Sequence, residues 1–186
     1  VPVKAIHLAD AIQIHNKFDV IFLAVKSYDT EWAAHFCKRL LKSDGVIVSN
    51  QNCMNDSLIA GIVGFNREIG CVMSSITVGL WEPAHVNRGG QPGRDTGHDV
   101  FRVGELNGRI TPRVEEITDV LSCIDDAKAT ANIWGERWSK LTTNASSNPV
   151  TAMTGLGSNG VAEIPEARRI QIEISKECCR VGISQK

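Results

Sequence analysis

The chain has 186 residues, of which 42% are hydrophobic and 22% are charged, and its formal net charge is −1. This balance is typical of a globular protein, and the interspersed acidic and basic residues argue against a nucleic-acid partner. No apolar run reaches the ~20 residues that a membrane-spanning helix needs. We therefore expect no membrane partner and a cytoplasmic location.

The six cysteines do not have the spacing of a metal site. None forms a Cys-x-x-Cys pair, and no histidine lies at zinc spacing from a pair of cysteines. We expect no bound metal and thiols in the reduced state.

Two apolar segments predict neighbouring strands of a sheet. Residues 18–25 are almost continuously apolar, which is typical of a strand buried on both faces, and residues 46–48 predict a second strand. A helical pattern over residues 31–41 connects them, and Asn55 or Asp56 can cap a further helix. Because the connections are short, this βαβ unit should have parallel strands.

The residues that follow these two strands are candidate ligand contacts. Parallel sheets bind ligands at the carboxyl ends of their strands, and those ends carry Lys26 and Asn52. Each residue alone is also compatible with a solvated lysine or a turn-forming asparagine. Together, on consecutive strand ends, they predict contacts to a phosphate or to a nicotinamide ribose.

The middle of the chain predicts shorter elements. Residues 69–78 are strand-like, and residue 86 and residues 101–103 fit short antiparallel strands. Pro112 fits the first position of a helix. Residues 129–133 fit a last edge strand.

A predicted helix over residues 134–153 carries a polar stripe. Lys140, Asn144 and Asn148 are four residues apart, so they share one face of a helix. Asn is a weak helix former and exposed helix faces usually carry Glu, Lys or Gln, which weakens the interpretation of an ordinary solvated stripe. One cation followed by two carboxamides can hold a small, oxygen-rich anion.

Residues 155–160 form a glycine-rich break, and residues 162–183 are again helical. We place the boundary between an α/β part and an all-helical part near residue 133.

Several segments together resemble the ketopantoate reductase family, the NADPH-dependent 2-dehydropantoate 2-reductases. The similarity runs from about residue 18 to the end, and its most specific part is the pattern Trp-x-Lys-Leu-x-x-Asn-x-x-x-Asn-Pro. The segments are Ala24-Val25-Lys26-Ser27, Ser49-Asn50-Gln51-Asn52, Val103-Gly104-Glu105-Leu106, and Arg137-Trp138-Ser139-Lys140-Leu141 with Asn144 and Asn148-Pro149.

The resemblance implies an α/β fold in two parts. Residues 1–133 would be the remainder of a Rossmann-type NAD(P)-binding domain, and residues 134–186 the start of an all-helical domain for substrate binding and dimerisation. The implied activity is that of an oxidoreductase that uses NADPH to reduce a 2-ketoacid, 2-dehydropantoate, to pantoate in pantothenate biosynthesis. A homodimer is left open.

The resemblance also implies roles for single residues. Lys26 and Asn52 match cofactor-contacting positions, and Asn52 also matches a position near the substrate. Lys140 matches the general acid, since an ammonium can stabilise the charge that builds on the keto oxygen and donate a proton to it. The substrate-binding amides of the family are matched by Asn144, Asn148 and Asn159.

The chain departs from the family pattern in three places. Asn52-Cys53 replaces the family's Asn-Gly and puts a side chain where backbone usually approaches the cofactor. The Gly-x-Gly-x-x-Gly turn that binds the pyrophosphate, and the basic residue that selects NADPH, belong upstream of residue 1. Helices with a further Ser and Glu of the site belong beyond residue 186. We therefore expect this fragment alone to be inactive.

Two alternatives remain open from the sequence. One is another NAD(P)-dependent dehydrogenase with a helical second domain, acting on an opine, a hydroxyacid or a sugar phosphate. The other is a truncated homologue that keeps the fold and binds partners without turnover, which Cys53 and the missing phosphate-binding turn favour. Turnover of a panel of ketoacids tests the first alternative, and cofactor titration tests the second.

Overall fold

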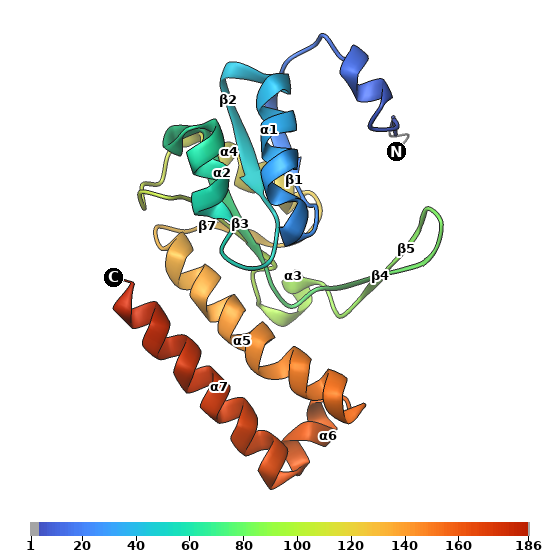
Figure 1. Cartoon of the computed structure of the whole chain (residues 1–186), viewed down its shortest axis with the longest axis vertical. Coiled ribbons are helices and arrows are strands. Elements are labelled where there is room, and N and C mark those ends of the chain that lie inside the picture. The colour runs from blue at the N-terminus through green and yellow to red at the C-terminus, as the bar shows by residue number, and fades with distance from the viewer. Residues whose placement is uncertain (1–3, 186) are drawn as a thin grey trace.

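A computed structural model describes residues 4–185, and its centre is a five-stranded sheet with the strand order β1-β2-β3-β6-β7 (Figure 1). The first three strands of that order are parallel, β6 is antiparallel to β3, and β7 is parallel to β6. The strands are β1 (Phe18–Leu23), β2 (Leu41–Ser49), β3 (Glu68–Met73), β6 (Phe101–Glu105) and β7 (Ala127–Ala129).

The predicted βαβ unit is confirmed. Helix α1 (Thr30–Leu40) connects β1 to β2, and helix α2 (Asp56–Val63) connects β2 to β3. Both helices pack on one face of the sheet, and the residues they bury with it are Leu23, Ala33, Ala34, Leu41, Ile47, Ile59 and Val63. Three short 3-10 helices span Asp10–Gln13, Ser27–Asp29 and Phe65–Arg67.

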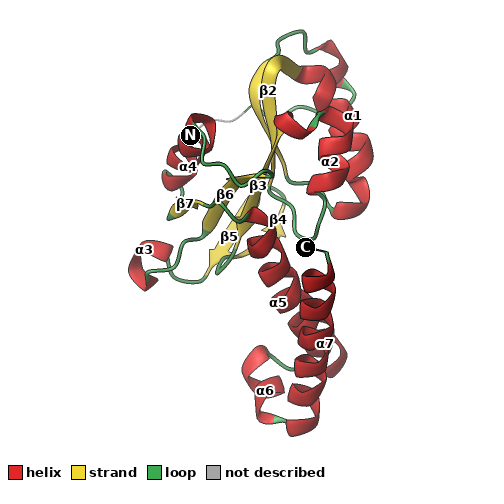
Figure 2. Ribbon diagram, turned by 90° about the vertical axis from the view of Figure 1, so that its left-hand side faces the viewer, coloured by secondary structure: helices red, strands yellow, loops and turns green. Residues whose placement is uncertain are grey.

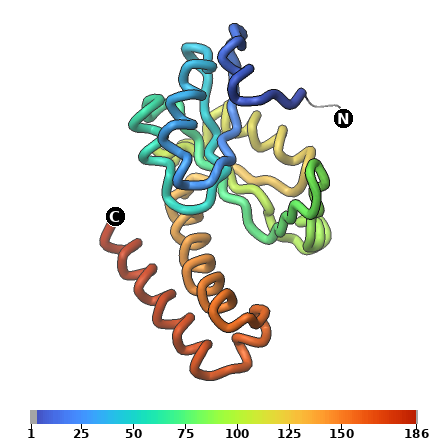
Figure 3. The backbone as a smooth tube through the Cα atoms, turned by 45° about the vertical axis from the view of Figure 1, so that its right-hand side comes forward, coloured from blue at the N-terminus to red at the C-terminus, as the bar shows by residue number. Residues whose placement is uncertain are grey.

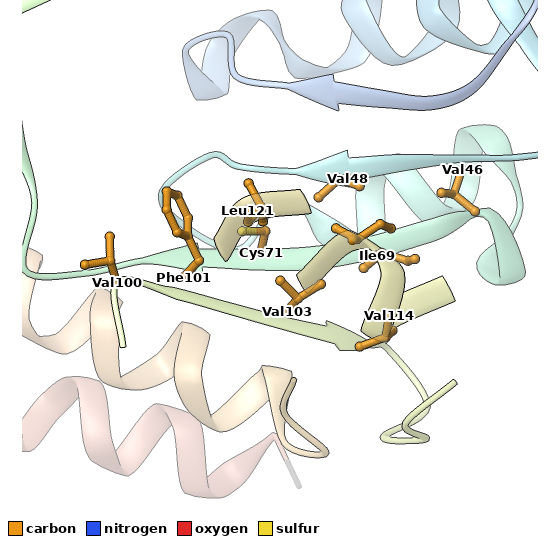
Figure 4. Packing of buried hydrophobic residues seen from close by; sticks show 10 residues of the cluster. Val46, Val48, Ile69, Cys71, Val100, Phe101, Val103, Val114 and Leu121 are labelled. Carbon is orange, nitrogen blue, oxygen red and sulfur yellow. The ribbon is translucent and has the colours of Figure 1, made fainter. Parts of the chain in front are cut away.

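Helix α4 (Pro112–Ser122) begins at the predicted proline and packs on the other face of the sheet. Residues alternate between the faces of a strand, so Val46 and Val48 of β2 face α4 while Ile47 faces α1 and α2. The hydrophobic core between the sheet and α4 is shown in Figure 4. It comprises Val46, Val48, Ile69, Cys71, Val100, Phe101, Val103, Val114, Ile117 and Leu121.

The prediction that the first strand is buried on both faces is wrong for the described residues. The side chains of Phe18, Val20 and Phe22 are 41, 37 and 42% exposed. Strand β1 lies at the edge of the sheet. Helix α4 lies over β6 and β7, and its core includes side chains of β2 and β3 but none of β1. Only the opposite side chains, such as Leu23, pack beneath α1.

The predicted strand over residues 69–78 is two strands. Strand β3 ends at Met73, and Ser75 then adopts a positive φ of 57°. The chain leaves the sheet there and forms a separate antiparallel hairpin that projects from the body of the molecule (Figure 1). The hairpin consists of β4 (Thr77–Glu82) and β5 (His85–Gly89), and the short helix α3 (Gly93–Thr96) follows.

The last part of the described chain is helical. Helix α5 (Ile133–Thr154) leaves the sheet, α6 (Ser158–Glu163) turns the chain, and α7 (Pro165–Ser184) runs back alongside α5 (Figures 2 and 3). Helix α5 continues through Pro149. The helical part begins where the predicted boundary lies, and its separation into a domain of its own stays a prediction. No helix among residues 4–185 is long and apolar enough to cross a membrane.

Candidate active site

The loops that follow β1 and β2 lie side by side at the carboxyl ends of these parallel strands. The Gln51 side-chain amide donates to the carbonyl of Val25 over 2.7 Å. The Ser27 hydroxyl donates to the carbonyl of Asn52 over 3.4 Å. Lys26 and Asn52 are therefore held on adjacent loops, as expected for consecutive parallel strands, and both side chains are exposed.

Cys53 has a backbone conformation that favours glycine, the residue that the family pattern has at this position. Its φ is 71°, in the left-handed region, and its side chain is exposed. Side chains in this region cost roughly 1–2 kcal/mol, whereas glycine adopts it freely. The turn after Asn52 therefore carries local strain.

We expect Cys53→Gly to raise the free energy of unfolding by about 0.5–1 kcal/mol, because the removed strain exceeds the added chain entropy of glycine. Urea unfolding measures the difference. The matched control is Cys123→Gly, the same change at an exposed cysteine with a φ of −67°. That control should lose stability, and an equal loss at both positions would contradict the assigned strain.

Helix α5 presents the predicted polar stripe. Its first turn is capped by Asn132, whose side-chain oxygen accepts a hydrogen bond from the amide of Gly135 over 3.0 Å. Lys140 and Asn144 are half-buried and Asn148 is exposed. Within residues 4–185 no carboxylate pairs with Lys140, so no ion pair neutralises its ammonium.

The half-buried position of Lys140 favours proton donation. Burial lowers the pKa of its ammonium below the usual 10.5. An ammonium with a lowered pKa releases its proton more readily near neutral pH, which makes it a better general acid.

Arg137 was assigned no role from the sequence, yet it fixes α5 to the sheet. Its side chain is 3% exposed, and its guanidinium donates to Asp56 Oδ1 over 2.7 Å from Nη2 and 3.2 Å from Nε. It also donates to the carbonyls of Gln51 and Ser49 over 2.6 and 2.8 Å. The first turns of α5 are therefore attached to the end of β2 and to the start of α2.

A signal for this contact is present in the sequence. Ile133, Arg137 and Leu141 are four residues apart and share a helix face, on which Ile133 is buried. A charged residue between apolar neighbours on a core-facing stripe indicates a buried ion pair, although it does not identify the partner.

Asp56 does not have the capping role that the sequence allowed. The N-cap position of α2 is Asn55, and its side chain makes no capping hydrogen bond. The side-chain amide of Asn55 instead donates to the Ser27 hydroxyl and to the carbonyl of Asn52, both over 3.0 Å. Asp56 is fully buried and pairs with Arg137, so it joins the helical part to the sheet.

Among the described residues, the Asn159 side chain makes no hydrogen bond with the other candidate site residues. Asn159 lies in the first turn of α6 with its side chain exposed. The spacing from Gly155 through Gly157 to Gly160 matches Gly-x-Gly-x-x-Gly in letters, but it follows a helix. The phosphate-binding fingerprint needs a strand before the turn and a helix after it, so these glycines do not form that site.

A groove of about 340 Å³ lies elsewhere, between α5 and α7. Several of its hydroxyls already donate to helix carbonyls, such as Thr142 to Trp138 and Ser175 to Gln171, both over 2.8 Å. None of the candidate site residues lines it; the lining residues are Thr142, Thr143, Ser146, Ser147, Ser158, Arg168, Gln171, Ile172 and Ser175. Among the described residues no cluster of His, Cys, Asp and Glu could hold a metal ion.

Two family models match the chain. A model described as ketopantoate reductase PanE/ApbA matches residues 1–99, and one described as ketopantoate reductase PanE/ApbA C terminal matches residues 132–186. A 2-dehydropantoate 2-reductase of Archaeoglobus fulgidus is 29% identical over 170 residues, which cover 88% of this chain and 54% of that relative.

Solved structures share the fold. A dimeric ketopantoate reductase from Staphylococcus aureus has a TM-score of 0.71 at 21% identity, covering 94% of this chain and 60% of the other. A D-mandelate dehydrogenase solved with NADH and anilino(oxo)acetate has a TM-score of 0.81 at 17% identity, covering 94% of this chain and 55% of the other. The predicted Rossmann-type α/β fold is confirmed, and the chain spans only a little over half the length of these relatives.

Proposed function

The chain belongs to the ketopantoate reductase family, and from this premise we propose that it takes part in the NADPH-dependent reduction of 2-dehydropantoate to pantoate. Lys140 is the general acid in this proposal. The observation that carries it is the half-buried ammonium of Lys140, with which no carboxylate of residues 4–185 pairs, on a helix that Arg137 attaches to the loop of Asn52.

The ends of β1 and β2 fit part of a nicotinamide dinucleotide. Lys26 and Asn52 are exposed on adjacent loops at the carboxyl ends of parallel strands, where sheets of this kind bind nucleotides. The positive φ of Cys53 keeps the turn beside them. When bound, the reduced nicotinamide supplies a hydride. The NADH named for the D-mandelate dehydrogenase supports a nicotinamide cofactor, and the choice of NADPH is our proposal.

On the helical side, the residues of α5 act on the substrate. The ammonium of Lys140 contacts the keto oxygen, stabilises the negative charge that builds there and donates the proton, a contribution of roughly 10²–10⁴-fold in rate. Asn144 and Asn148 follow at one-turn intervals and orient the hydroxyl and carboxylate of the acid. Asn52 and Asn159 supply further amides from the sheet side and from α6.

We also propose that the helical part, residues 134–186, is a domain that carries a homodimer contact. The dimeric reductase from Staphylococcus aureus supports a dimer. Helix α7 also leaves large apolar side chains exposed, at Ile170, Val181 and Ile183.

A panel of 2-ketoacids tests the substrate. NADPH oxidation is followed for the product of the longest reading frame that contains these residues, with 2-dehydropantoate, phenylglyoxylate and pyruvate compared. We expect kcat/KM for 2-dehydropantoate to exceed the others by about tenfold or more, since pocket contacts of a few groups discriminate by this amount. Equal values would remove the specific substrate and leave a general 2-ketoacid reductase. Oxidation of NADH at the same rate would remove the choice of NADPH.

A further inference from the structure

Helix α5 is joined to the carboxyl end of β2 and the loop after it by two hydrogen bonds from one arginine. The guanidinium of Arg137 donates to the carbonyl of Ser49, the last residue of β2, and to that of Gln51, which immediately precedes the candidate residue Asn52. The same group pairs with Asp56 at the start of α2. Strand β2, helix α2 and helix α5 therefore meet at the side chain of Arg137.

Lys140 lies three residues after Arg137 on the same helix, about 4.5 Å further along its axis. A helix is rigid over one turn, so a shift of Arg137 is transmitted to Lys140. We propose that Arg137 is a positioning residue that fixes where Lys140 stands relative to the Asn52 loop. This inference rests on the proposed role of Lys140 as the general acid.

A second buried carboxyl completes the cluster. Glu68, at the start of β3, is fully buried, and neither of its carboxyl oxygens has a hydrogen-bond partner among the described residues. Asp56 Oδ2 is likewise buried without a partner. The two carboxyl groups interact, and a proton on Glu68 would make it a donor to Asp56.

The charges around Glu68 agree with that protonated state. Burial, followed by the negative charge of Asp56, raises the pKa of Glu68 to about 10, and Glu105 acts in the same direction. Arg137 acts in the opposite direction and is outweighed. Glu105 is itself paired with Arg113 over 2.6 Å. At neutral pH Glu68 then carries no charge beside the ion pair of Arg137 and Asp56.

An ion pair of this kind is not needed merely to attach a helix. Well-packed apolar residues of similar volume often give equal or greater stability than a buried ion pair. The guanidinium instead fixes the position of α5 relative to the sheet. Its donors are planar and rigid, and they reach the Ser49 carbonyl, the Gln51 carbonyl and Asp56 Oδ1 together only when α5 is in this position.

The test compares Arg137→Lys with the double variant Arg137→Met/Asp56→Leu, which removes the ion pair without leaving a buried charge unpaired. Amide hydrogen exchange on the 186-residue chain is the first readout and needs no activity. We expect both variants to exchange faster than the parent at residues 49–53 and 134–144. Arg109→Met is the matched control at an exposed arginine and should exchange like the parent.

Turnover is the second readout, on the product of the longest reading frame. We expect kcat to fall about 100-fold in the double variant, since a misplacement near 1 Å costs this much, with a smaller rise in the KM for NADPH because the Asn52 loop also loosens. The melting temperature should fall by only a few degrees, because apolar packing offsets part of the lost hydrogen bonds to Ser49 and Gln51.

Parent-like exchange in both segments and parent-like kcat in a folded double variant would overturn the positioning role. If the double variant does not fold, parent-like exchange and kcat in Arg137→Lys would overturn it. If the parent reduces no ketoacid, the proposed function fails on its own. The exchange comparison then still decides whether Arg137 holds α5 against the Asn52 loop.

Discussion

Replacement of Lys140 by Met is expected to lower kcat for 2-ketoacid reduction by about 10²–10⁴-fold. Met keeps an unbranched apolar stem of similar length and removes only the ammonium, so the half-buried site stays filled. Because Lys140 lies on α5 and the candidate cofactor residues lie on the sheet, the KM for NADPH should change by less than about threefold. Steady-state NADPH oxidation measures both constants.

The role of Lys140 as general acid also predicts how the reaction depends on pH. Burial lowers the pKa of Lys140, and only the protonated form can donate. The value of kcat/KM should therefore fall as pH rises through this lowered pKa, below the ordinary 10.5, and the Met variant should lack that fall. Lys128→Met, at an exposed lysine of β7, is the control and should behave like the parent. A normal kcat with a greatly raised KM for NADPH would instead make Lys140 a cofactor-binding residue.

Glu68→Gln is expected to become increasingly stabilising, relative to the parent, as pH rises. The pKa of Glu68 is raised from 4.5 in the ordinary carboxyl to about 10 in the folded chain. Between these values the folded state holds a proton that the unfolded state has released, so the stability that is present at low pH is lost as pH rises. Gln needs no proton, and its amide can donate to Asp56 Oδ2 in place of a protonated carboxyl.

Urea unfolding of the parent and of Glu68→Gln from pH 6 to pH 9 measures this difference. The free-energy gap between the two proteins should widen by up to ~1.4 kcal/mol per pH unit, the limit for one proton. Glu115→Gln, the same change at an exposed position of α4, is the control and should show a constant gap. A gap for Glu68→Gln that stays constant over this range would show that Glu68 is ionised in the folded chain.

Local patterns in the sequence predict the elements that surround the site. Apolar runs and helical spacing predict β1, α1 and β2 because both depend on periodicity within a few residues. The stripe of Lys140, Asn144 and Asn148 is predicted for the same reason, since a helix sets which residues share a face. The position of Lys26 and Asn52 on adjacent loops follows from the parallel strands.

Features that depend on distant partners could not be predicted in this way. The run Phe18–Leu23 is apolar except for Asp19, but its exposure depends on whether another element covers the edge of the sheet. The pairing of Arg137 with Asp56 joins residues that are 81 positions apart. At its position in the sequence Asp56 serves equally well as a helix cap. The protonated state of Glu68 depends on that same long-range cluster.

The most direct test of the reductase assignment is NADPH oxidation with and without 2-dehydropantoate, with the product identified by mass spectrometry. The protein is the product of the longest reading frame that contains these residues. We predict NADPH consumption that depends on 2-dehydropantoate, yields pantoate in equal amount and falls about 10²–10⁴-fold in Lys140→Met. NADPH consumption without pantoate, or pantoate formation that survives in Lys140→Met at the parental rate, would contradict the account.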